Sequence, residues 1–253
     1  MIPMKTLVID VGGTNIKLLA TGRQEVCKIP SGPEMTADGM MRAVLGATHD
    51  WDYEVVSIGY PGPVVDGRPL REPYNLGKGW IDLDYQGRFG RSVKLINDAA
   101  MQAIGSYQGG RMLFLGLGTG LGSTMVAGKF VMPLELAHLP YRKGRTFEDY
   151  VGLRGLERLG KKKWCRAVAD VITRLKTAMV ADYVVLGGGN AKLIRKVPLD
   201  TRPGNNRNAF LGGFRLWEED ISIASPLHPS FDASSSIANT AKDPSPAALG
   251  RPL

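Results

Sequence analysis

Two glycine-rich turns, each placed between runs of β-branched and apolar residues, constrain the fold of this chain most strongly. The first turn lies within DVGGTNIK at residues 10–17, and the second is GLGTGLG at 116–122. The flanking apolar runs occupy residues 5–10, 15–20, 111–116 and 123–127. Two such runs joined by glycines are typical of a β-hairpin. The sequence therefore predicts two similar strand–turn–strand units, one near the start of the chain and one near its middle.

Further apolar runs extend this pattern along the chain. They predict strands at residues 54–59, 93–96 and 181–186, and helices at 99–107, 153–180 and 209–219. Strands that alternate with helices are typical of an α/β protein. The chain has 253 residues, of which 43% are hydrophobic. That is enough for one large domain or for two lobes around a cleft.

The two hairpin units suggest how the chain is divided. We expect a first lobe at residues 1–98 and a second at 99–221, with a last helix, 209–221, that is able to pack back on the first lobe. From about residue 222 the composition shifts to Ser, Pro and Ala. Such a composition is typical of a poorly ordered segment. We therefore expect residues 222–253 to lie outside the working core.

The glycine-rich turns are candidate phosphate sites, because backbone N–H groups approach an anion closely where no Cβ blocks them. Thr14 would add a hydroxyl donor, Lys17 a charge, and Asp10 a carboxylate that holds Mg²⁺ through water. The candidate residues are Asp10, Gly12, Gly13, Thr14, Lys17, Gly118, Thr119, Gly120, Gly187, Gly188 and Gly189. Taken alone, each turn is more often a simple turn, and none matches a Walker loop or a dinucleotide fingerprint. The set of three, with an acidic residue between the turns, points to a phosphate ligand.

That acidic residue, Asp98, follows Asn97 at the end of the predicted strand 93–96. A hydroxyl group is a poor nucleophile, and a carboxylate placed beside one can accept its proton as a new bond to phosphorus forms. The alternative is that Asn97 and Asp98 cap the following helix, a common role for both residue types. One residue can serve both purposes.

The ordered set of motifs resembles the ROK family of actin-like sugar kinases and regulators. DVGGTNIK resembles its first phosphate motif, LINDAA its catalytic motif, LGTGLGS its second phosphate motif and LGGGN its adenosine motif. The resemblance runs from about residue 5 to residue 219. It implies an α/β chain with the two-lobed, actin-like (ribonuclease H-like) fold and a cleft between the lobes. It also implies phosphoryl transfer to the 6-hydroxyl of glucose or a related hexose, with Asp98 as the base.

The same resemblance implies a set of sugar-binding residues. LELAHLP resembles the family's Glu-x-Gly-His sugar motif, TFEDYVG its second Glu motif, YNLGKGW its Asn-Leu stretch and the pair at 61–62 its Pro-Gly loop. The implied sugar residues are Pro61, Gly62, Asn75, Asn97, Asp98, Glu135, His138 and Glu148. Carboxylates and imidazole suit a polyol, since each can exchange hydrogen bonds with ring hydroxyls. The alternatives are a structural histidine and glutamates on a solvated helix face.

Two departures from the family pattern bear on these residues. Ala137 stands where the family has a glycine beside the histidine, which puts the local backbone shape in question. The family's zinc-binding cysteine cluster is missing, and Cys27 and Cys165 lie far apart. We therefore expect no zinc, no disulfide framework, and His138 free to bind the sugar. Mg²⁺ is the metal that phosphoryl transfer implies.

The phosphoryl donor is open between ATP and inorganic polyphosphate. ATP is favoured because LGGGN resembles the adenosine motif. Polyphosphate is favoured by the short chain, by the missing zinc loop and by basic residues at 141–145 and 161–163, which could line a track for a polyanion. Those cations could equally be solvated side chains.

Composition bears on partners and location. The net charge of +8 favours anionic partners or reflects a basic soluble surface,. No signal peptide is apparent, and no apolar run approaches the roughly 20 residues of a spanning helix. We expect a cytoplasmic protein with a small-molecule hexose as its partner, no nucleic acid, no membrane, and the homodimer that the resemblance implies.

Two other functions compete with a kinase. The first is a sugar-sensing ROK repressor, which would carry a helix-turn-helix before the first phosphate strand; that strand is predicted at residue 5. The second is a sugar-binding module without catalysis, which the intact glycine turns and Asp98 disfavour.

Overall fold

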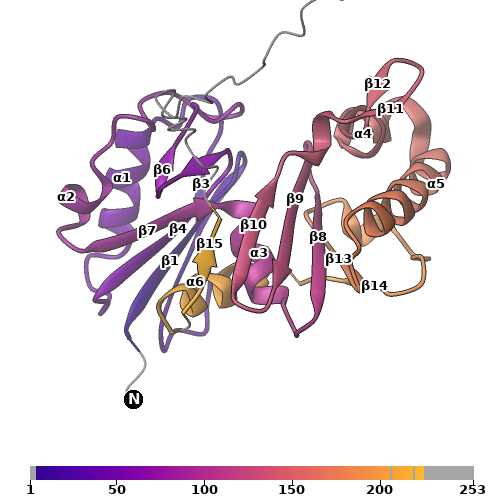
Figure 1. The fold of residues 1–253 in the computed structure, drawn as a ribbon. Coiled ribbons are helices and arrows are strands. Elements are labelled where there is room, and N and C mark those ends of the chain that lie inside the picture. The colour runs from indigo at the N-terminus through magenta and orange to yellow at the C-terminus, as the bar shows by residue number, and fades with distance from the viewer. Residues whose placement is uncertain (1–3, 206, 219, 225–253) are drawn as a thin grey trace, which may run out of the picture.

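The computed structural model describes residues 4–205, 207–218 and 220–224 of the chain. It holds two mixed β-sheets that stand side by side, with helices α3 and α6 between them (Figure 1). The predicted tail at 222–253 lies outside the described residues apart from its first three. In the part of the chain that is described, no helix is long and apolar enough to cross a membrane.

The first sheet is built around the first predicted hairpin. Its strand order is β3 (Cys27–Pro30), β2 (Asn15–Ala20), β1 (Thr6–Val11), β4 (Val55–Tyr60) and β7 (Ser92–Asn97). β1 is antiparallel to β2 and parallel to β4, which is in turn parallel to β7. β1 and β4 are buried along their whole length because both faces of the sheet are covered,.

The second sheet repeats this plan around the second predicted hairpin. The order is β14 (Thr201–Pro203), β13 (Tyr183–Gly187), β8 (Arg111–Leu117), β9 (Leu121–Ala127), β10 (Phe130–Leu134) and β15 (Ser222–Ile223). β8 and β9 form the antiparallel hairpin, and β13 and β14 add in parallel beside β8, as β4 and β7 do beside β1. Both lobes thus place a glycine turn at the carboxyl end of their first strand.

Helices cover the outer and inner faces of the sheets. In Figure 1, α1 (Ala37–Ala47) and α2 (Tyr85–Phe89) lie outside the first sheet, and α4 (Phe147–Val151) and α5 (Leu153–Ala178) outside the second. Between the sheets, α3 (Asp98–Ser106) packs closely on α6 (Asn208–Glu218). Gly212 permits this packing because it has no side chain: a Cβ there would overlap the carbonyl of Met101. This packing buries apolar residues of both lobes in one cluster.

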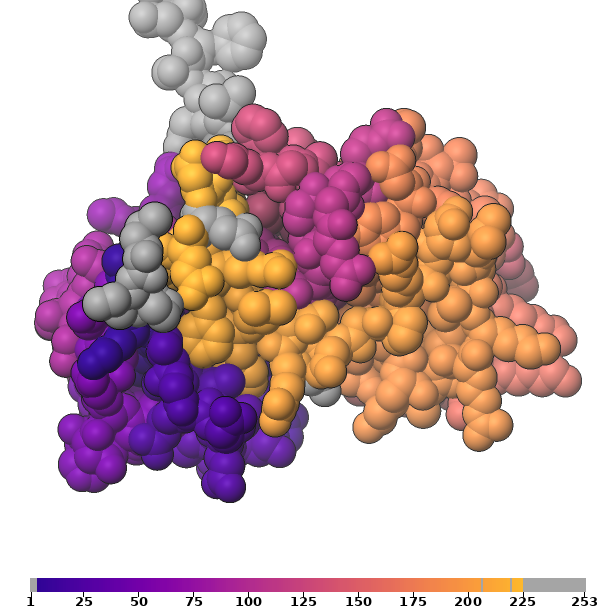
Figure 2. Space-filling view, turned by 90° about the horizontal axis from the view of Figure 1, so that it is seen from below, coloured from indigo at the N-terminus to yellow at the C-terminus, as the bar shows by residue number. Residues whose placement is uncertain are grey.

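Helix α6 joins the two lobes. It contacts β1 and β4 as well as α3, and Ser57 donates a hydrogen bond of 2.6 Å to the carbonyl of Gly213. Figure 2 shows the yellow segment that contains α6 lying between the indigo residues of the first lobe and the orange residues of the second. The last helix therefore packs on the first lobe although it comes after the second in sequence.

Several short elements complete the chain. They are the hairpin β5 (Val64–Val65) with β6 (Arg68–Pro69), the 3-10 helix η1 (Leu136–His138), the hairpin β11 (Pro140–Arg142) with β12 (Arg145–Thr146), and the 3-10 helix η2 (Ala191–Leu193). The helix predicted at 153–180 is not continuous: Gly160 has a φ of 70° and a ψ of 156° and breaks α5. Glycine adopts this conformation without steric cost, so the helix can change direction there.

Candidate active site

The carboxyl ends of the parallel strands in the first sheet gather the first group of candidate residues. Asp10 of β1 pairs in register with Gly59 of β4, and Tyr60 of β4 with Asn97 of β7. The Asp10 side chain is 8% exposed and accepts an ion-paired hydrogen bond of 2.7 Å from Lys17 on the neighbouring strand. Lys17 therefore neutralises Asp10 and does not stand as a free cation in the first turn.

Asn97 and Asp98 begin helix α3 and differ in what they contact. The Asn97 side chain caps the helix by accepting a hydrogen bond of 3.1 Å from the N–H of Ala100, and it donates one of 3.0 Å to the carbonyl of Gly62. Asp98 accepts a hydrogen bond of 2.7 Å from the N–H of Ala99. The capping role thus falls mainly to Asn97, which also fixes the Pro-Gly loop, and Asp98 has one oxygen left for another partner.

The electrostatic setting of Asp98 favours a carboxyl group that titrates near neutral pH. Removal from water and the negative charge of Asp10 raise its pKa to about 7. The backbone N–H of Ala99 and the charge of Lys17 act in the opposite direction and only partly offset this rise. A base with such a pKa is poised to take a proton and release it again at physiological pH.

The first glycine turn lies against the segment that holds Asn75. The N–H of Gly12 donates to the carbonyl of Asn15, which closes the turn, and Ser31 donates a hydrogen bond of 2.6 Å to the carbonyl of Gly12. A Cβ at Gly13 would lie 3.2 Å from the Cβ of Asn75. The turn and Asn75 are thus in contact, and a larger residue at position 13 would disturb both.

The two glycine turns of the second lobe lie side by side. Strands β8 and β13 are parallel and end together, with Gly116 in register with Gly187. Asn190 ties the two turns: its N–H donates to the carbonyl of Leu117 at 2.9 Å, and its side chain to that of Gly118 at 3.0 Å. Asn190 closes the LGGGN segment, and the motif alone did not predict a role for it. A polar side chain directly after a glycine run was the available signal.

The second glycine turn also approaches the start of α3. A Cβ at Gly122 would lie 2.9 Å from the Cβ of Ala99, the residue after Asp98. The structure therefore brings Asp98 close to both lobes, with Asp10 and Lys17 of the first turn on one side and the strand that follows the second turn on the other.

Glu135, His138 and Glu148, the residues of the predicted sugar motifs, differ in exposure and in what they contact. Glu135 precedes η1 and His138 is its last residue, with Oε2 of Glu135 and Nε2 of His138 3.8 Å apart; their side chains are 69% and 71% exposed. Glu148 of α4 is 24% exposed; it accepts a hydrogen bond of 3.3 Å from the N–H of Leu121 and pairs with Arg154 at 3.5 Å. Helix α4 contacts both η1 and β9, so the elements that carry these three residues are neighbours.

Ala137, which departs from the family pattern, fits its place. It is buried within η1 and has no positive φ, so the position does not need the backbone freedom of glycine,. Cys27 and Cys165 are free thiols. Within the described ranges, no group of three or more His, Cys, Asp or Glu side chains could hold a metal ion.

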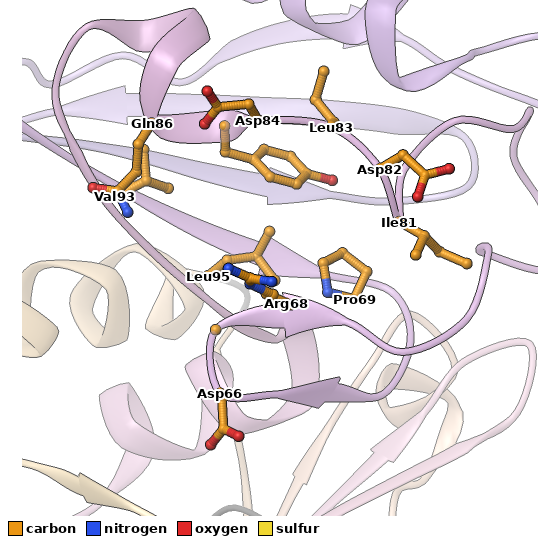
Figure 3. Close-up of a pocket in the computed structure, with 12 residues that line it drawn as sticks. Asp66, Arg68, Pro69, Ile81, Asp82, Leu83, Asp84, Gln86, Val93 and Leu95 are labelled. Carbon is orange, nitrogen blue, oxygen red and sulfur yellow. The ribbon is translucent and has the colours of Figure 1, made fainter.

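A cavity of about 460 Å³ lies away from these residues, on the outside of the first lobe. Figure 3 shows it between strand β7, the β5–β6 hairpin and the segment at 81–86, with Asp82, Arg68 and Leu95 among its lining residues. None of the predicted site residues lines it. The candidate site is therefore identified by the convergence of strand ends and glycine turns, and this cavity belongs to a different surface.

No protein-family model and no curated protein sequence matches the chain. Solved structures do. The inorganic polyphosphate/ATP-glucomannokinase from Arthrobacter sp. strain KM is 22% identical, with a TM-score of 0.72 over 85% of this chain and 98% of the other. A ROK family glucokinase from Streptomyces griseus in complex with glucose and AMPPNP is 20% identical, with a TM-score of 0.69 over 85% and 99%.

A ROK family transcriptional regulator, described as a homologue of the E. coli MLC protein, also matches. It is 16% identical, with a TM-score of 0.61 over 86% of this chain and 78% of the other. At these identities the likeness concerns the fold, which kinases and regulators share. The fold predicted from the sequence is confirmed: this chain has the two-lobed, actin-like α/β fold of the ROK sugar kinases.

Proposed function

We propose that the protein is a ROK-type sugar kinase that transfers a phosphoryl group from ATP to the 6-hydroxyl of glucose or a related hexose. The observation that carries this proposal is the position of Asp98, a carboxyl group with a pKa of about 7 beside Asp10 and Lys17 of the first glycine turn and beside the strand that follows the second. A carboxylate with a pKa near the working pH, placed beside both glycine turns, suits the role of a general base in phosphoryl transfer.

In the reaction, the Asp98 carboxylate accepts the proton of the sugar 6-hydroxyl. The hydroxyl oxygen forms a bond to the γ-phosphorus of ATP as the bond from that phosphorus to the β–γ bridging oxygen breaks. The products are sugar 6-phosphate and ADP. The proton on Asp98 passes to solvent after the products leave, which its pKa near neutrality permits,.

The donor phosphates would lie between the two glycine turns. Backbone N–H groups at 13–14 and 119–120 are the proposed donors of hydrogen bonds to them, since the N–H groups of Gly12 and Gly118 already donate within their own turns,. The hydroxyls of Thr14 and Thr119 belong to the same two segments. The purine would lie against the turn of Gly187, Gly188 and Gly189. Asn190, the next residue, is hydrogen-bonded to the second glycine turn and so holds the two turns together. A backbone that is already fixed costs little entropy when the ligand binds.

A magnesium ion fits this site. Mg²⁺ is held by one or two carboxylates, several waters and substrate phosphates, so it does not require a group of three protein ligands. Asp10 supplies a carboxylate, in part shared with Lys17, and Asp98 a second negative charge nearby. When bound, the ion would neutralise charge on the phosphate oxygens of the donor.

The sugar would lie between the first-lobe residues Asn75, Asn97, Pro61 and Gly62 and the second-lobe residues Glu135, His138 and Glu148. Glu135 and His138 are exposed in this structure. Bound sugar and a movement of one lobe toward the other would bury them and exclude water, so that phosphate passes to the sugar and not to solvent.

Polyphosphate is the second candidate donor. One of the structural neighbours is a polyphosphate/ATP enzyme, and in this chain basic side chains follow the second glycine turn along α5. A sugar-sensing regulator is a weaker candidate: one structural neighbour is a ROK family transcriptional regulator, but the position of Asp98 beside both glycine turns favours a phosphoryl-transfer site. A duplex-binding assay distinguishes it. The homodimer and the cytoplasmic location remain predictions.

A coupled kinase assay over a panel of hexoses, with ATP and with polyphosphate as donors, tests the proposal. We expect turnover with ATP and Mg²⁺ for glucose or a hexose that differs from it at one or two hydroxyls. Absence of turnover for every hexose with either donor would contradict it.

A further inference from the structure

A basic cavity of about 360 Å³ lies on the outer side of the second lobe, beyond α4. It is lined by Arg142, Tyr150, Leu159, Lys163, Arg166 and Ala167. The β11–β12 hairpin supplies Arg142, α4 supplies Tyr150, and α5 supplies the other four. Three of the six lining residues are cations and none is acidic, so the cavity is suited to an anion.

The positive charge of the chain is concentrated around this cavity. Residues 140–166 hold nine basic and three acidic side chains, a net charge of +6 out of +8 for the whole chain. The side chains of Lys163 and Arg166 have no hydrogen-bond or ion-pair partner among the described residues. Arg142 pairs with Asp170 at 3.0 Å, and Asp170 is shared with Tyr141 and Arg174. Two of the three lining cations are therefore free to bind an external anion.

The break in α5 explains which cations line the cavity. After Gly160 the helix resumes with Lys161, Lys162 and Lys163. Lys163 and Arg166 are three residues apart, so they lie on the same face of the helix, whereas Lys161 and Lys162 do not line the cavity,. The sequence presents 161–163 as one charge run, but the structure separates Lys163 from its two neighbours.

A row of cations connects this cavity to the second glycine turn. Helix α5 begins at that turn, since the N–H of Leu153 donates a hydrogen bond of 3.0 Å to the carbonyl of Thr119. Arg154 follows directly, and Arg158 lies one helical turn further on the same face,. The Arg158 guanidinium lies 4.9 Å from the ring centre of Tyr150, which lines the cavity.

We propose that Arg154, Arg158, Lys163 and Arg166, here called the α5 cation surface, bind the phosphate chain of inorganic polyphosphate. The reactive end of the polyphosphate would lie at the second glycine turn, and the following phosphates would run along α5 into the cavity. This inference rests on the proposed function, because it takes the second turn to be a donor site. It assigns polyphosphate a binding surface that ATP, which ends at its nucleoside, does not reach.

Nucleic acid is a poorer fit to the same surface. Single-stranded nucleic acids bind through aromatic side chains on which bases stack, as well as through cations. Tyr150 is the one aromatic lining residue of the cavity, and Arg158 already covers its ring. A surface of cations without free aromatic rings suits a polyanion without bases.

The test measures the binding of long-chain polyphosphate and of tripolyphosphate to the full chain at low and at physiological ionic strength. We expect the double variant Lys163→Glu/Arg166→Glu to weaken long-chain binding at least about tenfold at low salt, since attraction is replaced by repulsion, and this loss to shrink as salt screens the surface. Tripolyphosphate is too short to leave the glycine turn, so its affinity should change less than about twofold.

The matched control is Lys161→Glu/Lys162→Glu, which changes the net charge equally and on the same helix without touching the cavity. An equal loss of long-chain binding in both double variants would overturn the proposal in favour of a general charge effect. So would a wild-type protein that binds long chains no more tightly than tripolyphosphate, or one that binds a single-stranded oligonucleotide of similar charge more tightly than polyphosphate.

ATP-dependent sugar phosphorylation, measured on the same variants, separates this inference from the proposed function. Both double variants should retain wild-type turnover with ATP, which also shows that they are folded. If ATP supports turnover but Lys163→Glu/Arg166→Glu, the cavity variant, binds polyphosphate normally, the assignment of polyphosphate to the α5 cation surface is wrong and the proposed kinase function stands. If neither donor supports turnover but the cavity variant selectively loses polyphosphate, the binding surface stands and the kinase does not.

Discussion

The carboxylate of Glu148 accepts a hydrogen bond of 3.3 Å from the backbone N–H of Leu121, where strand β9 begins within the second glycine-rich segment. A residue of the predicted sugar motif therefore holds the turn that is proposed to bind the donor phosphates. Glu135 and His138, from the other sugar motif, make no such contact with that turn among the described residues. The three residues should consequently differ in what their substitution does.

Glu135→Gln and His138→Ala should raise the KM for the sugar, each by a factor equivalent to about 1–3 kcal/mol, because a hydroxyl of the bound sugar loses its partner. Glu148→Gln should raise the KM for the sugar and also that for the donor, since the N–H of Leu121 loses a charged acceptor,. Steady-state kinetics with each substrate varied in turn measure this. A sugar KM that is unchanged in all three variants would show that the sugar binds elsewhere.

Two glycines of the second turn provide a matched pair of substitutions. A Cβ at Gly120 would overlap Oε2 of Glu148, whereas a Cβ at Gly118 would meet no atom within 4 Å. Gly120→Ala should therefore lower the melting temperature and weaken donor binding. Gly118→Ala should leave the melting temperature nearly unchanged yet still raise the donor KM, because the open space beside it is proposed to receive phosphate. Normal donor KM in Gly118→Ala would argue against phosphate at this turn.

Most of the regular elements could be predicted from periodicity and glycine punctuation. The run at 15–20 is β2, and the runs at 5–10, 54–59 and 111–116 match β1, β4 and β8 to within one residue at each end. Strands buried on both faces are continuous apolar runs, which are visible in sequence. Short elements such as η1, α4 and the β11–β12 hairpin were not predicted, since fewer than six residues carry no readable period.

The candidate site was only partly readable from the sequence. Residue types and motif order identified Asp10, Asp98 and the glycine turns. The pairing of Lys17 with Asp10, and of Arg154 with Glu148, depends on which strands and helices become neighbours, and local sequence does not contain that information. The broken helix at Gly160 was missed for a similar reason, because a single glycine within an apolar period is also compatible with a continuous helix,.

The pKa of Asp98 predicts a pH dependence of catalysis. A base must be ionised to accept a proton, so kcat/KM should rise with pH through an apparent pKa near 7 and then level off,. The rise should be absent from the residual activity of Asp98→Asn. A profile measured from about pH 5 to pH 9 tests this, and a flat wild-type profile across pH 7 would contradict Asp98 as the base.

The same pKa predicts a pH dependence of stability. The folded-state pKa of Asp98 is raised from 3.8 to about 7, so the folded protein binds the proton more tightly than the unfolded chain. Ionised Asp98 therefore destabilises the fold, increasingly as pH rises from 3.8 to about 7 and fully above it,. Asp98→Asn should melt at a higher temperature than the wild type at pH 8, with a smaller difference at pH 5. An equal difference at both pH values would contradict the raised pKa.

Metal analysis tests the departure from the family's zinc pattern. The purified protein should contain no stoichiometric zinc, and removal of transition metals by a selective chelator should not unfold it, whereas activity should require Mg²⁺. Elemental analysis and thermal melting before and after chelation provide the measurement. About one zinc per chain, lost together with the folded state, would contradict this prediction.

The central claim is that Asp98 is the base of an ATP-dependent hexose kinase, and the turnover of Asp98→Asn tests it most directly. Formation of hexose 6-phosphate from ATP is measured for the wild type, for Asp98→Asn and for the control Asp82→Asn, which makes the same chemical change at an exposed position. We predict that Asp98→Asn lowers kcat by about 10²–10⁴-fold with sugar binding retained, and that Asp82→Asn is fully active. Nearly full turnover by Asp98→Asn would remove Asp98 from the mechanism and leave it only a place in the first turn of α3.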